Sequence, residues 1–259
     1  MWRSLIAYIR YRMHCKQWAH SPFVYDFICT ILHSTEKMPQ WKRIENARSQ
    51  LRHSHKSLNF LDLGTSGRKN GMMSIRSISS IVRQSCKSPK VCRLLSRIVS
   101  HYECKHIVEF GTSLGMSTSY LASAAVQGKV FTVEGCPEVS QVASQVFEFL
   151  HFRNIEQINV DFEYALEHFA DRFQNIDLFF LDGNHAYVPT MKYFRFAKQY
   201  ASNHTIFIFD DIHWSKEMEK AWKEIVADED VTVSIDLFCV GVVFFRKEIT
   251  KQHFVLKYI

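Results

Sequence analysis

Acidic side chains stand at the ends of two apolar segments in the second half of the chain. IDLFFLD ends at Asp182, and TIFIFDD ends at Asp210 and Asp211. Neighbouring parallel strands lie about 4.8 Å apart and end at one rim of a sheet, where these carboxylates could converge. Such oxygen ligands favour Mg²⁺ or Ca²⁺ over zinc. We therefore predict a metal site at these three residues. In the alternative, Asp182 contacts a cofactor or caps the next helix, and the other two acids lie in an ordinary loop.

A histidine follows the first of these acids by three positions, in LDGNHAY. An imidazole has an ordinary pKa near 6.5 and can accept a proton at neutral pH. We predict that His185 is a general base and that Asp182 belongs to the same catalytic site. A histidine that caps the following helix or holds Asp182 is the alternative, and His213 is the rival base. Trp214 is a candidate wall of an acceptor pocket, although a core position is equally compatible with its type.

A second candidate site begins at Glu109, in EFGTSLG. Gly111 and Gly115 stand where a strand would turn into a helix, and glycines there let the backbone approach a ligand closely. The spacing is G-x-x-x-G, which differs from the G-x-G-x-x-G of dinucleotide-binding loops. Because Glu109 would repel phosphates, this turn suits a cationic ligand. A tight turn without a ligand is the alternative.

The next apolar segment, KVFTVE, ends at Glu134. An acid at the tip of the second strand can accept both hydrogens of a ribose diol, as in nucleoside-cofactor folds. A solvated glutamate at a strand end is the alternative. Together with the glycine turn, Glu134 favours a nucleoside ligand.

These residues require a sheet of parallel strands to position them. From residue 106, short apolar segments alternate with helical stretches, which is typical of right-handed βαβ crossovers and a sheet covered on both faces. The last two segments, VTVSIDLF and VGVVFFRK, are too close for a crossover helix and must pair antiparallel. We predict an α/β fold with a doubly wound, mostly parallel, seven-stranded, Rossmann-like sheet that closes with an antiparallel hairpin.

The first part of the chain favours helices instead. Ser21-Pro22 and Ser88-Pro89 are typical of helix starts, and KVCRLLSRIVSHY carries an apolar stripe. We expect residues 1–87 to form a basic helical appendage that covers the acceptor site or mediates oligomerisation, and residues 88–259 to form the catalytic domain. LDLGTSGRKNG imitates the glycine turn, but no βα series continues from it. Its Arg68 and Lys69, with Arg83 nearby, could select an anionic acceptor, although plain solvation is the simpler interpretation.

Charge divides the chain unevenly. Residues 1–105 hold 19 Lys and Arg against 5 Asp and Glu, whereas the remainder holds 13 against 21. The basic part either meets an anionic partner or is neutralised by the acidic remainder. No compact Lys/Arg run or RNA-binding signature is present, so we do not expect a nucleic-acid partner, without excluding one.

Composition bounds the class of protein. With 47% hydrophobic and 22% charged residues, the 259-residue chain can bury a core. Its 7 cysteines never form C-x-x-C, and no apolar run reaches the roughly 18–20 residues of a membrane span. We therefore expect a cytoplasmic protein without a secretory signal, a disulfide framework or a zinc site. The aromatic residues Trp2, Trp18 and Trp41 could serve a homodimer contact or a membrane surface.

The segments IVEFGTSLGMSTSYLA, VFTVEG, INVDFEYAL, DLFFLDGNHAY and FIFDD, in this order, resemble class I S-adenosylmethionine-dependent methyltransferases. More narrowly, the sequence resembles the catechol and caffeoyl-CoA type of O-methyltransferases, over residues 88–248. The resemblance implies that Glu109, Gly111 and Gly115 line the methionine end of the cofactor and that Glu134 binds its ribose. It also implies an adenine site at Asp161 and Phe162, although this chain reads Val-Asp-Phe where relatives often have Gly-Asp-Ala. The full expected cofactor set is Glu109, Gly111, Thr112, Ser113, Gly115, Ser117, Glu134, Gly135, Asp161, Phe162 and Asp182.

The resemblance also bears on the acidic cluster. Metal-dependent relatives carry acids at the positions of Asp182, Asp210 and Asp211, and they often have a lysine base where this chain has His185. The sequence thus predicts methyl transfer from S-adenosylmethionine to a small-molecule hydroxyl, with Mg²⁺ as a candidate assistant. Alternatives are a larger anionic acceptor, RNA or a glycan, and a cofactor-binding module without turnover.

Overall fold

The computed structural model describes residues 8, 11–15, 20–62 and 72–258. Two compact units make up the chain. The central unit comprises Ser34–Arg172, and the terminal unit combines Met1–His33 with Phe173–Ile259.

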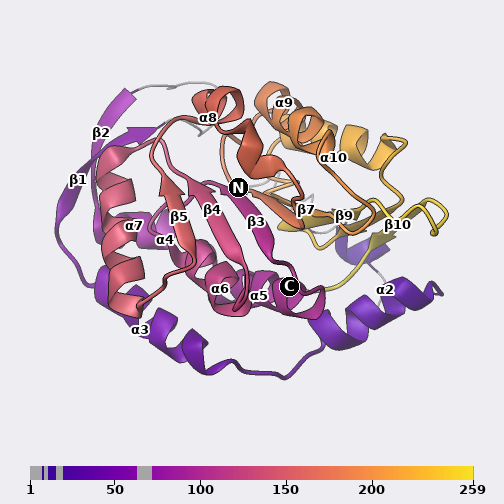
Figure 1. Ribbon diagram of the computed structural model, residues 1–259, viewed down its shortest axis with the longest axis horizontal. Coiled ribbons are helices and arrows are strands. Elements are labelled where there is room, and N and C mark those ends of the chain that lie inside the picture. Colours follow the sequence, from indigo (N-terminus) through magenta and orange to yellow (C-terminus); the bar gives the residue numbers. More distant parts are fainter. Residues whose placement is uncertain (1–7, 9–10, 16–19, 63–71, 259) are drawn as a thin grey trace. The chain divides into compact units, whose positions relative to one another are not determined.

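The central unit contains three parallel strands in the order β3-β4-β5. They are drawn side by side in Figure 1. In the register of β3 and β4, Glu109 lies opposite Thr132 and Phe110 opposite Val133. Glu109 and Glu134 therefore lie at or next to the carboxyl ends of neighbouring strands. The strand bounds are β3 (His106–Phe110), β4 (Lys129–Val133) and β5 (Ile155–Ile158).

Helices follow these strands as the apolar periodicity predicts. The hydroxyl of Ser88 accepts a hydrogen bond from the N–H of Val91 at the start of α5, with Pro89 at the first helical position. The apolar stripe of α5 is buried, as expected. The helices of this unit are α3 (Pro39–Arg52), α4 (Ile78–Gln84), α5 (Pro89–His101), α6 (Met116–Ala124), α7 (Pro137–Leu150) and α8 (Phe162–His168).

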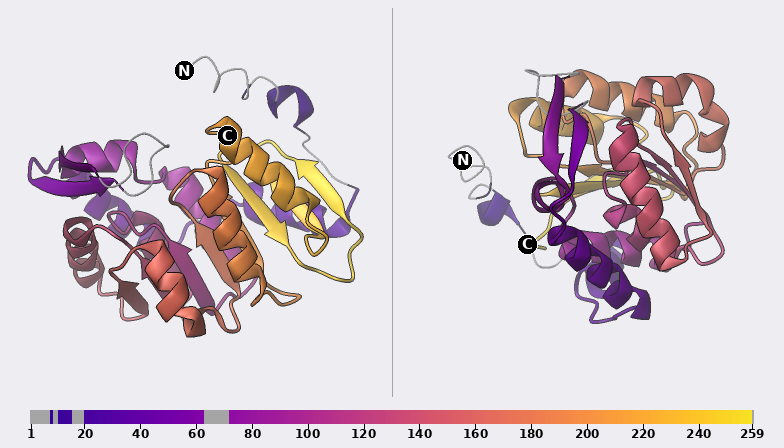
Figure 2. Two further views of the ribbon diagram at one scale, coloured as in Figure 1. Left: turned by 90° about the horizontal axis from the view of Figure 1, so that it is seen from above. Right: turned by 90° about the vertical axis from the view of Figure 1, so that its left-hand side faces the viewer.

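An antiparallel hairpin lies within the first part of the chain, for which the sequence favoured helices. Strands β1 (Ser57–Asp62) and β2 (Met72–Ser77) pair from Ser57 opposite Ser77 onward. Leu58 is buried against α4 and α7, so the hairpin depends on contacts that are distant in sequence and that local composition does not reveal. Figure 2 shows the hairpin in two views, and β1 contacts α7. Arg68 and Lys69 lie outside the described residues.

The terminal unit contains five strands in the order β10-β8-β9-β7-β6. β8 and β9 pair antiparallel, which confirms the predicted closing hairpin, and β9 is also antiparallel to β7. β10 pairs parallel with β8 and is additional to the seven expected strands. The bounds are β6 (Leu178–Leu181), β7 (Ile206–Asp210), β8 (Val233–Asp236), β9 (Val240–Phe244) and β10 (Gln252–Val255).

Helices α9 (Tyr187–Lys198) and α10 (Lys216–Ala227) lie side by side in this unit (Figure 1). The beginning of the chain belongs to the same unit, because Phe23 and Phe27 pack edge-on against Phe244 of β9. These phenylalanines come from the short α2 (Pro22–Asp26) and the π-helix η1 (Phe27–Leu32). Pro22 starts α2 as predicted, although the Ser21 side chain makes no capping hydrogen bond. The short 3₁₀ helix η2 (Ala170–Phe173) joins the two units. Within the described part of the chain, no helix is long and apolar enough to span a membrane.

Candidate functional site

The connection from β3 to α6 requires its two glycines. Gly111 has φ +108° and Gly115 has φ +77°, values that L side chains rarely adopt. A Cβ at Gly115 would also lie 2.5 Å from the ring of Phe147. The turn is tied to the neighbouring strand, since the backbone N–H of Gly111 donates to the carbonyl of Val133. The G-x-x-x-G spacing therefore reflects a tight backbone path close to α7.

Glu109 is fully buried beneath this turn. Its Oε2 accepts hydrogen bonds from the hydroxyls of Thr118 (2.5 Å) and Thr132 (2.7 Å). A buried carboxylate is costly without such donors. These two threonines carry no sequence signal beyond their positions on α6 and β4. They hold in place the carboxyl group that we expected beside the turn.

Glu134 connects two loops. Its Oε2 accepts a hydrogen bond from the backbone N–H of Ser113 (2.9 Å), and its Oε1 accepts one from Cys136 (2.9 Å). The carboxylate is thus held by backbone groups at the carboxyl end of β4.

Other expected cofactor residues lie in the same unit. Asp161 is exposed and caps α8, because its Oδ1 accepts a hydrogen bond from the N–H of Tyr164 (2.8 Å). The ring of Phe162 stacks on Phe110 at the tip of β3, with centroids 4.7 Å apart. Thr112 is buried with its hydroxyl on Thr132. Ser117 is buried at the start of α6, and Gly135 lies between β4 and α7.

The glycine turn contains a buried polar atom. The Oγ of Ser113 is buried and has no hydrogen-bond partner among the residues that the structure describes. Buried hydroxyls normally find a partner. Gly111 lets the backbone approach a ligand closely, and the acids Glu109 and Glu134 lie nearby in the fold. This turn therefore fits a polar, positively charged nucleoside cofactor.

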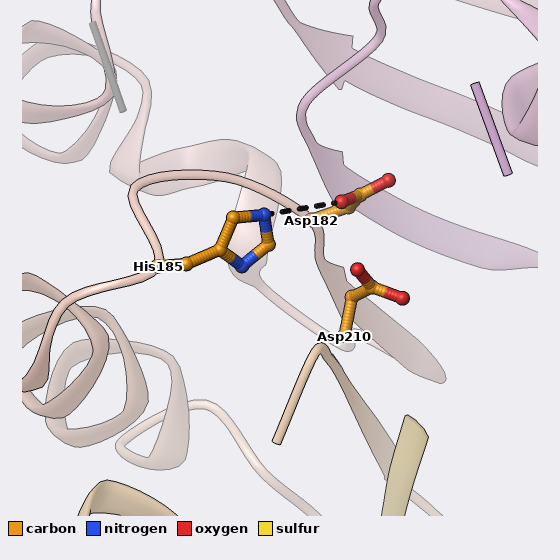
Figure 3. A group of neighbouring side chains, drawn as sticks. All are labelled: Asp182, His185 and Asp210. Atoms are coloured by element: carbon orange, nitrogen blue, oxygen red, sulfur yellow. Dashed lines mark ion pairs between the residues drawn. The ribbon is translucent and has the colours of Figure 1, made fainter. Parts of the chain in front are cut away.

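The terminal unit holds the second candidate site. Ligand atoms of Asp182, His185 and Asp210 all lie within 4.8 Å of one another. Asp182 and His185 follow β6, whereas Asp210 ends β7 and is nearly buried. Figure 3 shows the imidazole pointing toward Asp182, with the Asp210 carboxylate beside them. The parallel strands thus bring both loops together, as predicted.

Two carboxylates lie near the same ring nitrogen of His185. Its Nε2 lies 3.7 Å from Oδ1 of Asp182 and 3.9 Å from Oδ2 of Asp211. Asp211 itself has φ +54°, and its N–H donates to the carbonyl of Cys239 (2.7 Å). The compact donor set therefore includes His185, and Asp211 approaches the imidazole of that residue. One imidazole and two carboxylates suit Mn²⁺, Fe²⁺ or Zn²⁺ as well as the Mg²⁺ expected from three acids.

The rival base, His213, contacts a different acid. Its Nε2 lies 2.7 Å from Oδ2 of Asp236, and its ring stacks on Phe238. Burial alone would lower the pKa of His213, but the hydrogen bond and the charge of Asp236 outweigh burial and raise it. This ion pair was missed from sequence because 23 residues separate its members. Trp214 is largely exposed, which excludes a core position.

Comparisons with known proteins agree with this arrangement. Residues 108–212 match the family described as "Methyltransferase domain" (Methyltransf_24). A comparison with curated protein sequences found no match.

Solved structures share the fold at low sequence identity. An O-methyltransferase from Bacillus cereus, solved in complex with SAH, is 16% identical with a TM-score of 0.57, over 88% of this chain and 98% of that one. The O-methyltransferase TomG from Streptomyces achromogenes, solved with SAM, is 15% identical with a TM-score of 0.58, over 86% and 94%. An SAH-bound methyltransferase from Podospora anserina is 11% identical with a TM-score of 0.61, over 89% and 98%.

The fold is therefore that of the class I methyltransferases, as the sequence resemblance predicts. Residues 108–212 thus resemble a methyltransferase domain, and the solved structures share its fold.

Proposed function

We propose that this protein transfers a methyl group from S-adenosylmethionine to a hydroxyl group of a small molecule. The observation that carries the proposal is that Nε2 of His185 lies near both Asp182 and Asp211, at 3.7 and 3.9 Å. An imidazole near two carboxylates can accept a hydroxyl proton, since negative charge stabilises the imidazolium that results. When bound, S-adenosylmethionine supplies an electrophilic methyl group on a positively charged sulfur.

In this proposal the central unit binds the cofactor. Gly111 and Gly115 let the backbone approach the cofactor closely, and the buried hydroxyl of Ser113 hydrogen-bonds to it. Glu134 accepts the ribose hydroxyls, and the buried charge of Glu109 favours a cationic ligand. Phe162 presents an aromatic face for adenine, together with Asp161 at the start of α8.

The terminal unit orients the acceptor and removes its proton. His185 takes the proton, and Asp182 holds the imidazole in place for this step. Trp214 in the loop that follows β7 and Val188 in the first turn of α9 are exposed apolar side chains. They favour an acceptor with an apolar body next to its hydroxyl, such as a phenol.

A divalent ion is the second form of the proposal, supported by the donor set of Asp182, His185 and Asp210. When bound, the ion would lower the pKa of the acceptor hydroxyl and hold it. His185 cannot act as a free base while its nitrogen binds metal, so the two forms differ in what a chelator does. The same assay decides between them.

The test is methyl transfer from radiolabelled S-adenosylmethionine to a panel of phenols, aliphatic alcohols and short RNAs, with and without EDTA. We expect labelled ether products from the phenols. Label in RNA alone would favour the larger anionic acceptor, for which the exposed Lys90 and Arg93 on α5 are the supporting observation. Binding of S-adenosylmethionine without any transfer would favour a module without turnover.

Homodimerisation and a cytoplasmic location stay predictions. Analytical ultracentrifugation tests the first, and fractionation of expressing cells tests the second.

A further inference from the structure

Strand β1 is attached to the start of α7 by one asparagine. The backbone N–H of Asn59 donates to Oε2 of Glu138 (2.8 Å), and its Nδ2 donates to Oε1 of the same carboxylate (2.6 Å). The thiol of Cys136 approaches the carbonyl of Asn59 at 3.5 Å. Both backbone polar groups and the side-chain amide of Asn59 are therefore engaged by the connection between β4 and α7.

The same connection holds Glu134. Cys136 donates its backbone N–H to Oε1 of Glu134, whose other oxygen is bonded to Ser113. A continuous series of hydrogen bonds thus runs from Asn59 through Cys136 and Glu134 to the glycine turn. Every member lies in the central unit.

An apolar cluster lies along the same path. Leu114 of the glycine turn is fully buried, as is Ile81 of α4. Leu58 of β1 belongs to the same cluster, so the hairpin supports both loops by packing as well as by hydrogen bonds. The cluster consists of Leu58, Ile78, Ile81, Val82, Leu114, Cys136, Val139 and Val142.

The charge state of Glu138 agrees with this role. Hydrogen bonds from the side chain and backbone of Asn59 lower the pKa of Glu138, and the positive charge of Lys56 adds to the effect. The carboxylate is therefore ionised at neutral pH, and Asn59 donates to a charged acceptor.

We propose that Asn59 and Glu138 are positioning residues for the cofactor, because their contact fixes the loop that orients Glu134. The inference rests on the proposed use of Glu134 as the ribose ligand. It makes cofactor affinity depend on a hairpin 79 positions away from Glu138. Neither residue needs to touch the cofactor for this effect.

The test is calorimetric titration of S-adenosylhomocysteine into the wild type and into Asn59→Ala, Glu138→Ala and the double variant. We expect each single variant to weaken binding by about 3- to 10-fold, the range of one or two lost hydrogen bonds. The double variant should bind no more weakly than Glu138→Ala, because both changes remove the same contact. The matched control is Glu148→Ala, an exposed glutamate on the same helix.

Kinetics separate positioning from stability. We expect KM for S-adenosylmethionine to rise by the same factor in both variants, with kcat unchanged at saturating cofactor. Wild-type affinity in both variants would overturn the inference, even if their Tm is lowered. A fall in kcat with KM unchanged would also overturn it, even if their Tm is lowered. If the wild type itself fails to bind S-adenosylhomocysteine, the proposed function fails and this inference fails with it. If the wild type binds S-adenosylhomocysteine and only the variants bind it poorly, the proposed function is unaffected.

Discussion

The carboxylate of Glu134 and the backbone N–H of Ser113 are joined by a hydrogen bond of 2.9 Å, although 21 positions separate them. This bond connects the tip of β4 to the glycine turn that follows β3. The acid and the turn therefore form one site, and neither is expected to bind a nucleoside without the other.

Replacing the acid tests this site. We expect Glu134→Ala to weaken S-adenosylhomocysteine binding by about 10- to 100-fold, since hydrogen bonds to a charged group are worth roughly 1.5–3 kcal/mol. Isothermal titration calorimetry measures the change. Glu138→Ala should have a much smaller effect, and equal affinities for wild type and Glu134→Ala would exclude Glu134 as a ligand.

The glycine turn makes a separate prediction about stability. Gly115→Ala places a methyl group 2.5 Å from the ring of Phe147 at φ +77°. The left-handed backbone alone costs roughly 1–2 kcal/mol, so we expect the free energy of unfolding in urea to fall by at least about that amount.

Gly135→Ala is the matched control for this change. Gly135 lacks a positive φ, and its substitution should leave the urea midpoint nearly unchanged. A wild-type midpoint for Gly115→Ala would show that the turn is not as tightly built as described.

The proposed base gives a kinetic prediction. We expect His185→Ala to lower kcat by about 10²–10⁴-fold, the usual contribution of a general base, with little change in S-adenosylhomocysteine affinity. His213→Ala serves as the comparison, because that imidazole is bonded to Asp236. A large loss of kcat in His213→Ala with near-normal turnover in His185→Ala would reverse the assignment.

Metal dependence follows from the donor set near β6 and β7. In the metal-bound form of the proposal, excess EDTA abolishes turnover and added Mn²⁺ restores it, because imidazole and carboxylate together suit this ion. Asp210→Asn should then raise the Mn²⁺ concentration required for half-maximal activity. Full turnover in EDTA would exclude a metal requirement, and His185 would then act as a free base.

An ion pair in the central unit predicts a dependence of stability on pH. Burial alone would raise the pKa of Glu156, but hydrogen bonds from Lys129 and Arg172 outweigh burial and lower it. A carboxylate with a lowered folded-state pKa stabilises the fold above its unfolded value, near 4.3, and this contribution is lost as the pH falls through the folded value.

Glu156→Gln should therefore lower Tm at pH 7 by about 2 °C, since the group is partly exposed and solvent screens the pair. The difference between variant and wild type should shrink as the pH falls below the unfolded value, about 4.3. Melting curves at pH 7 and at several pH values below about 4 check this, and a difference that does not shrink with falling pH would mean that the effect is not electrostatic.

Strand-and-helix alternation and strand-end residues were predictable from sequence because both obey local rules. Apolar segments that end in Glu134 or Asp182 place those side chains at strand tips once a parallel sheet forms. The φ values of Gly111 and Gly115 likewise agree with the residue type.

Contacts between distant segments were not predictable in the same way. Asn59 meets Glu138 across 79 positions, and His213 meets Asp236 across 23. Neither pair has a spacing that marks it, since register and packing bring them together only after the sheet has formed. The β1–β2 hairpin was missed for the same reason.

The most direct test is a crystal structure of the protein with S-adenosylhomocysteine. Our account predicts both ribose hydroxyls on the carboxylate of Glu134, the Ser113 hydroxyl in contact with the ligand and adenine against Phe162. A ligand bound elsewhere, or a Glu134 side chain turned away from the ribose, would contradict it.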